Sequence, residues 1–204
     1  SIHSLEGNQG TMNDLRKLYG TDRSPVELST QETESRIDEN RASAISHLSD
    51  AQLNDELAED SRVLRDGRND LLSAQTDDLR SQIQRRIEQT AIDYAMLQVQ
   101  QMLGKSQFFL NNAMTDNQRR EFNEKVRTFD ARKTALDIGN QLGLTDVALK
   151  EYSAAVNDAW RTVMTETPFT SPIEFFNSLR TVFGDSLRNL AGNTSAFIPL
   201  GPKK

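Results

Sequence analysis

Residues 76–104 read TDDLRSQIQRRIEQTAIDYAMLQVQQMLG and form the longest uninterrupted helical pattern in the chain. Thr76 is a suitable N-cap, Asp77 and Asp78 lie where the positive end of the helix dipole favours carboxylates, and Gly104 is a stop signal. Between these ends, apolar residues recur every three or four positions and therefore share one face of a helix. They are Leu79, Ile83, Ile87, Ala91, Tyr94 and Leu97.

The second half of this segment carries a further apolar row. The row begins just after Ala91 and consists of Ile92, Met96, Val99 and Leu103. A helix that is apolar on two sides is buried by more than one neighbour. The segment, about 42 Å long at 1.5 Å per residue, is therefore predicted to be the central helix of an all-α bundle. Its second half is expected to be enclosed on more sides than its first.

Capping sequences predict where the other helices begin. The pattern of a hydroxyl residue followed three positions later by Glu or Gln occurs at residues 49–52, 115–118 and 171–174, and Thr145 with Asp146 is a further N-cap. The first of these helices is expected to end near Gly67, the second near Leu142 before Gly143, and the last near Gly184, followed by a short turn. Trp160 is predicted to be a core anchor of the bundle.

Charge and aromatic content divide the chain near residue 76. Residues 1–76 carry 15 acidic and 8 basic residues, whereas residues 77–204 carry 15 and 16, and only Tyr19 of the 13 aromatic residues lies in the first part. Such a segment buries too little apolar surface to offset the entropy of ordering it alone. We therefore predict a polar acidic arm that is partly disordered or ordered by a partner (1–48), a helix that packs on the central helix (49–75), a helical bundle (76–192) and an extended tail (193–204).

The residue types that carry chemistry are sparse. The chain has no cysteine, which excludes disulfides and thiolate sites, and its two histidines, His3 and His47, lie in the polar arm. Paired carboxylates such as Glu56 with Asp60 are flanked by arginines, and we expect them to be exposed to solvent. Since no catalytic motif or phosphate-binding loop is recognisable, we predict a protein that is not an enzyme, with no cofactor, no metal ion and no evident small-molecule substrate.

The charge and hydropathy of the chain also bear on its partners. A net charge of −6 with scattered bases makes nucleic-acid binding unlikely. No apolar run is long enough to span a membrane, and the sequence shows no signal peptide. We expect a soluble protein of unassigned localisation, either part of a particle or exported.

Taken together, these features favour a non-enzymatic structural or protein-interaction subunit of a larger assembly, of virion type or secretion-machinery type. It would dock on other proteins or on copies of itself through its arm and its tail, where an apolar plug fills a groove on this molecule or on a neighbour. The alternative is an exported regulator or effector whose flexible N-terminal segment serves secretion and chaperone binding. The candidate partner-binding residues are Leu15, Leu18, Tyr19, Phe108, Phe109, Phe197, Ile198 and Leu200.

The division at residue 76 generates a prediction for the central helix. Substituting Met96 or Leu97 by Asp is expected to unfold the bundle, because both lie in the enclosed half, whereas Ile83→Asp should mainly loosen the arm. Thermal melts followed by circular dichroism compare the three variants. Equal destabilisation by all of them would contradict the division.

Overall fold

The structure, a computed structural model, describes residues 40–103, 115–165, 172–191 and 196–197. In these ranges every regular element is a helix, which confirms the all-α prediction, and none of these helices is long and apolar enough to cross a membrane. Residues 40–46 form a short helical segment. It is followed by α4 (Asp50–Ser73), α5 (Asp77–Leu103), α6 (Asp116–Arg127), α7 (Ala131–Gln141), α8 (Asp146–Thr165), α9 (Pro172–Leu179), the π-helical η2 (Arg180–Asp185) and α10 (Ser186–Ala191).

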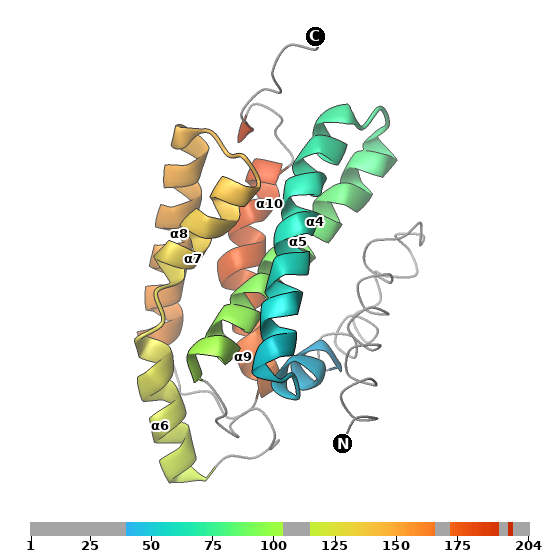
Figure 1. Cartoon of the computed structure of the whole chain (residues 1–204). Coiled ribbons are helices and arrows are strands. Elements are labelled where there is room, and N and C mark those ends of the chain that lie inside the picture. The colour runs from blue at the N-terminus through green and yellow to red at the C-terminus, as the bar shows by residue number, and fades with distance from the viewer. Residues whose placement is uncertain (1–39, 104–114, 166–171, 192–195, 198–204) are drawn as a thin grey trace.

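Helices α4 and α5 form a hairpin along one side of the bundle (Figure 1). The predicted capping box at the start of α4 is present, with the Ser49 hydroxyl and the Gln52 side chain each accepting the other residue's backbone N–H. The predicted end near Gly67 is wrong, because α4 continues to Ser73. A Cβ atom at Gly67 would lie 2.8 Å from Ile87 Cγ1, so this glycine permits close packing of the two helices and does not stop α4.

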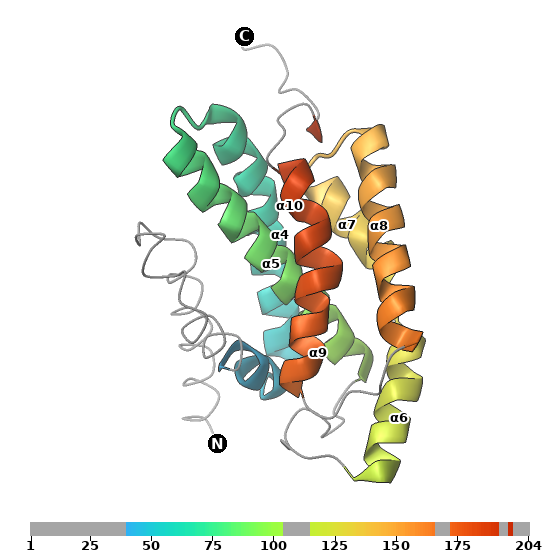
Figure 2. The same cartoon turned by 180° about the vertical axis from the view of Figure 1, so that it is seen from behind.

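Helix α5 is the centre of the fold, as the sequence predicts. It contacts α4, α6, α7, α9, η2 and α10, and Figure 2 shows α9, η2 and α10 running beside it. Every residue from Ile87 to Leu97 is buried, whereas its first turn is exposed. Leu79 departs from the predicted core face and is 44% exposed, because α4 ends at Ser73 and no described element covers the start of α5.

The region predicted as one helix from residue 115 to Leu142 is two helices. The chain leaves the helical path between α6 and α7, where the Asp130 carboxylate accepts the N–H of Lys133 at 2.9 Å and starts α7. The break directs Phe129 into the core, with its ring 5.3 Å from that of Trp160. Trp160 is also 6.2 Å from Phe175, so it is a core anchor as predicted. Gly143, at φ +67°, closes α7 as expected.

The last helices continue through Gly184, which corrects the predicted stop there. A Cβ atom at Gly184 would lie 2.8 Å from Ile92 Cδ1, so this residue is a close contact between η2 and α5. The adjacent Phe175 and Phe176 are both fully buried, so this chain itself covers the two sides of α9 on which they lie. The wider π-helical turn is supported by Tyr152, whose hydroxyl donates to the Phe183 carbonyl at 3.1 Å.

Tyr152→Phe tests this support. Burial raises the pKa of Tyr152, so its hydroxyl stays protonated and donates to the carbonyl at neutral pH. Removing the hydroxyl leaves a buried acceptor without its donor, which is expected to cost about 1–3 kcal/mol of unfolding free energy. Urea unfolding measures the loss. An unchanged midpoint and slope would show that the hydrogen bond does not stabilise η2.

Candidate functional site

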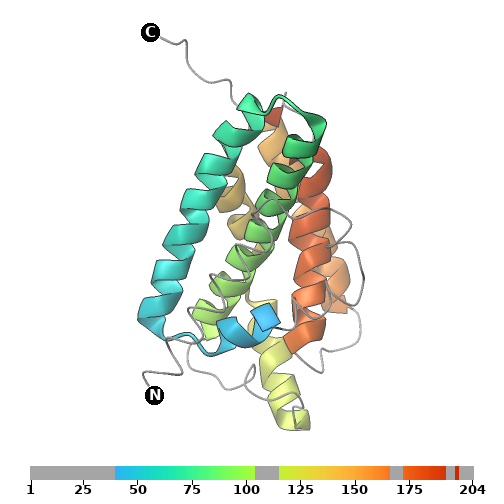
Figure 3. The ribbon, with the colours of Figure 1, turned by 90° about the vertical axis from the view of Figure 1, so that its right-hand side faces the viewer.

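A buried ion pair fastens the end of the acidic arm to the central helix. Arg41 Nε donates to Asp93 Oδ1 at 2.8 Å, a second guanidinium nitrogen contacts Asp93 Oδ2, and the two side chains are only 2% and 1% exposed. Gln89 Nε2 donates to the same carboxylate at 3.5 Å. We call residues 40–48 the arm anchor, and Figure 3 shows its helical segment at the end of the bundle where α4 begins. Its buried apolar residues are Ala42, Ala44, Ile45 and Leu48.

Because the ion pair is buried, it can select which segment packs against Asp93. Removing two charges from water costs several kcal/mol per ion, and their attraction only roughly compensates for this cost. A hydrophobic pair could therefore give similar stability, but Asp93 accepts only a segment that brings a cation to it. In the sequence Arg41 lies in a mostly polar stretch, and the one signal that this stretch packs is its apolar stripe of Ile37, Ala44, Ile45 and Leu48.

A second polar contact joins α5 to α7. The Tyr94 hydroxyl donates to Asp137 Oδ2, and Gln141 Nε2 donates to Asp137 Oδ1 at 3.2 Å. Burial, and then the hydrogen bond to Asp137, raise the pKa of Tyr94, so the phenol remains a donor at neutral pH. The contact fixes the orientation of α7 on the central helix.

A third contact joins α5 to α10. Glu88 is 8% exposed and lies 3.5 Å from Arg188 Nε, while Gln84 Nε2 donates to Glu88 Oε1 at 3.3 Å and to the Arg188 carbonyl at 2.7 Å. Burial raises the pKa of Glu88, and the charge of Arg188 opposes that shift. Asp185 also lies 3.3 Å from Arg188, so the arginine is shared between two carboxylates.

The paired carboxylates of α4 contradict the sequence expectation. Glu56 and Asp60 were expected to be exposed but are 1% and 0% exposed, respectively. They lie on the same face of α4 as the buried Leu53, Leu64 and Leu71, at intervals of three or four residues. Across the described ranges, no group of three or more metal-ligating side chains comes together.

The turn between α4 and α5 contains a surface depression, which we call the hairpin depression. It has a volume of about 290 Å³. The buried Ala74 and Ile83 and the partly exposed Leu79 form its apolar part. The remaining lining residues are Asp70, Ser73, Gln82 and Arg86.

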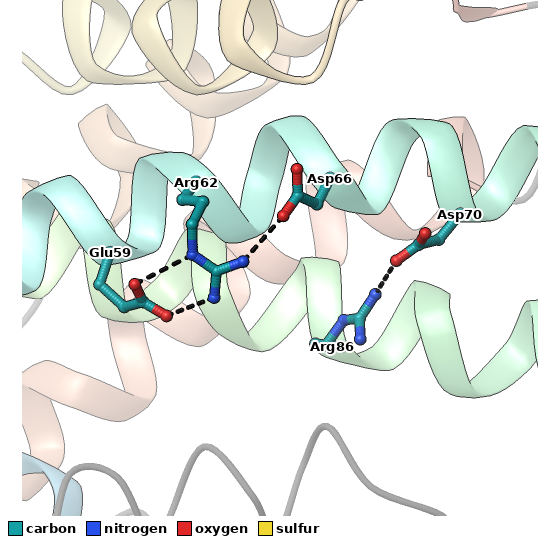
Figure 4. Close-up of polar contacts among 5 residues, drawn as sticks. All are labelled: Glu59, Arg62, Asp66, Asp70 and Arg86. Atoms are coloured by element: carbon teal, nitrogen blue, oxygen red, sulfur yellow. Dashed lines mark hydrogen bonds and ion pairs between the residues drawn. The ribbon is translucent and has the colours of Figure 1, made fainter.

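An ion pair between Arg86 and Asp70, 2.7 Å long, closes one side of the hairpin depression (Figure 4). Farther along α4, Arg62 contacts Glu59 and Asp66 in the same view. Since these side chains are between 28% and 55% exposed, each pair contributes no more than about 1 kcal/mol. They form a solvated face beside the depression.

Only one of the predicted partner-binding residues lies within the described part of the chain. Phe197 is 2% exposed and forms an isolated antiparallel bridge with Leu144, next to a hydrogen bond of 2.8 Å from the Thr145 N–H to the Ala196 carbonyl. Phe197 is therefore buried against its own chain. The others lie outside the described residues: Leu15, Leu18, Tyr19, Phe108, Phe109, Ile198 and Leu200.

Comparisons of this chain with protein-family models, with curated proteins and with solved structures found no match.

The arm anchor provides a stability prediction. Arg41→Met leaves Asp93 buried without its cation and is expected to cost about 3–5 kcal/mol, whereas Arg41→Met with Asp93→Leu should recover most of that loss. Urea unfolding gives the free energies. Arg62→Met, which breaks exposed ion pairs, is the matched control and should cost less than about 1 kcal/mol. Equal costs for the Arg41 and Arg62 variants would contradict burial of the pair.

The contact between α5 and α10 provides a pH prediction. Because the pKa of Glu88 is raised on folding, its contribution to stability is complete below its unfolded pKa and is lost as pH rises through its folded pKa. The free energy of unfolding of Glu88→Gln, relative to the unaltered protein, should therefore increase between pH 4 and pH 7. Urea unfolding at several pH values measures the difference. Glu124→Gln on the exposed face of α6 controls for the lost charge, and an equal trend in both variants would contradict the account.

Proposed function

We propose that this protein is a non-enzymatic structural or protein-interaction subunit of a larger assembly, and that it docks through its arm and its tail. The observation that carries the proposal is the buried pair between Arg41 and Asp93. It holds the arm at a defined point on the most enclosed helix. A partner that binds the arm would therefore take a defined position relative to the bundle.

The tail supports the same proposal from the other end of the chain. The contacts of Ala196 and Phe197 with the corner between α7 and α8 hold it at a second defined point. Residues 198–204 continue from there and include the candidates Ile198 and Leu200. The arm and the tail therefore each leave the bundle from a fixed point, which suits a subunit that contacts neighbouring subunits through these segments.

The experiment compares the full chain with a chain that lacks residues 1–39. The deletion stops before the arm anchor, because removing residues 40–48 would also remove Arg41 and expose buried apolar residues. Size fractionation of lysate from the source cells, with detection by antibody, measures the mass of the complexes that contain the protein. We expect the full chain at masses well above its own 23.0 kDa and the shortened chain near the monomer mass.

Two results would overturn the proposal. One is elution of the full chain as a monomer, and the other is an unchanged complex after the deletion. Loss of export by a shortened chain whose complexes are unchanged would instead favour the exported regulator. Circular dichroism of the shortened chain verifies that the bundle remains folded.

A further inference from the structure

The hairpin depression has the size and the mixed lining of a site for a small metabolite. Ala74, Leu79 and Ile83 form its apolar part, and Leu79 is 44% exposed although it is a large apolar residue. The volume of about 290 Å³ is close to the lower limit of about 300 Å³ for small-molecule sites in proteins. The depression therefore suits a ligand that combines a short apolar group with a few polar atoms.

Two opposite charges lie together on one side of the depression. Arg86 Nη2 donates to Asp70 Oδ2 at 2.7 Å, and Figure 4 shows that this pair bridges α5 and α4. Among the described lining residues, these two alone are charged. An anion bound to Arg86 would lie beside the Asp70 carboxylate, and a cation bound to Asp70 would lie beside the guanidinium. A ligand with one charge is therefore repelled as well as attracted, whereas a zwitterion matches both groups.

The lining groups retain hydrogen-bonding capacity for such a ligand. Arg86 Nε is buried and has no acceptor in the part of the chain that the structure describes. The Ser73 hydroxyl donates to the Asn69 carbonyl at 2.9 Å, so its oxygen can accept from an ammonium group. The Gln82 side chain offers both an amide donor and a carbonyl acceptor. A carboxylate and an ammonium group can therefore each find partners here.

We propose that the hairpin depression binds a free α-amino acid with an apolar side chain. The carboxylate pairs with Arg86, the ammonium group pairs with Asp70, and the side chain covers Leu79 and Ile83. Because Asp70 and Arg86 are 49% and 28% exposed, the site is partly solvated. A ligand of about ten non-hydrogen atoms then binds with a dissociation constant on the order of 1 mM. The inference does not rest on the proposed function, because neither the arm nor the tail takes part.

Titration of the full chain with L-leucine, followed through the backbone amide signals of an isotope-labelled sample, tests the proposal. We expect saturable shifts in residues 70–86, with a dissociation constant on the order of 1 mM. Three analogues each lack one group of leucine: isocaproate lacks the ammonium group, isoamylamine lacks the carboxylate, and glycine lacks the apolar side chain. Each should bind at least about tenfold more weakly than leucine, since each leaves one part of the site without its partner.

Variants of the lining charges extend the test to the protein. Arg86→Gln and Asp70→Asn each remove one charge of the pair and should weaken leucine binding by about tenfold. Arg62→Gln and Asp66→Asn are the matched controls, because they remove a similar exposed ion pair of α4 that lies outside the depression (Figure 4). They should leave binding unchanged. Circular dichroism verifies that the four variants are folded.

Three results would overturn the proposal. The first is the absence of saturable shifts at leucine concentrations well above the expected dissociation constant. The second is equal binding of leucine and isocaproate, because the ligand class would then be a simple carboxylate. The third is leucine binding that Arg86→Gln leaves unchanged, because the ligand would then occupy another part of the surface.

Discussion

The enclosure of α5 by its own chain is the constraint on which the other contacts depend. A helix that is surrounded on all sides must be apolar or must find a partner for each polar group. Helix α5 uses the second solution at three points, where Asp93 pairs with Arg41, Tyr94 with Asp137 and Glu88 with Arg188. Each partner comes from a different segment, namely the arm anchor, α7 and α10. We infer that these contacts select which segment covers which side of α5, while the apolar residues around them supply most of the stability.

Close backbone packing completes this arrangement. Gly67 of α4 meets Ile87, and Gly184 of η2 meets Ile92, so the two elements that cover α5 on either side approach it at residues without a side chain. The second approach accompanies a π-helical turn, whose Phe183 carbonyl accepts a hydrogen bond from Tyr152. The arm anchor then covers a remaining part of α5, and the tail closes the corner between α7 and α8. Residues 40–48 of the arm and residues 196–197 of the tail are therefore part of the packed structure.

Features that depend on neighbouring residues in the sequence were predictable. The caps at Ser49, Thr115 and Thr145, the core position of Trp160 and the greater enclosure of the second half of α5 all follow from local patterns. Features that depend on a distant segment were not. Gly67 and Gly184 have the sequence signature of a helix stop, and only the facing isoleucines make them packing positions. The partner of Asp93 lies 52 residues away, and the burial of Glu56 and Asp60 depends on helices that face α4. Of the candidate site residues, only Phe197 lies in the described part of the chain, where it is buried.

Native-state hydrogen exchange tests the enclosure of α5 most directly. If the chain itself encloses this helix, the amides of residues 91–97 are released only by global unfolding, and their opening free energies equal the unfolding free energy from urea titration. Those of residues 79–82, beside the hairpin depression, are lower. Residues 91–97 opening at a free energy well below that of global unfolding, in the monomeric protein without partners, would contradict the account, because part of the surface that covers α5 would then have to come from another molecule.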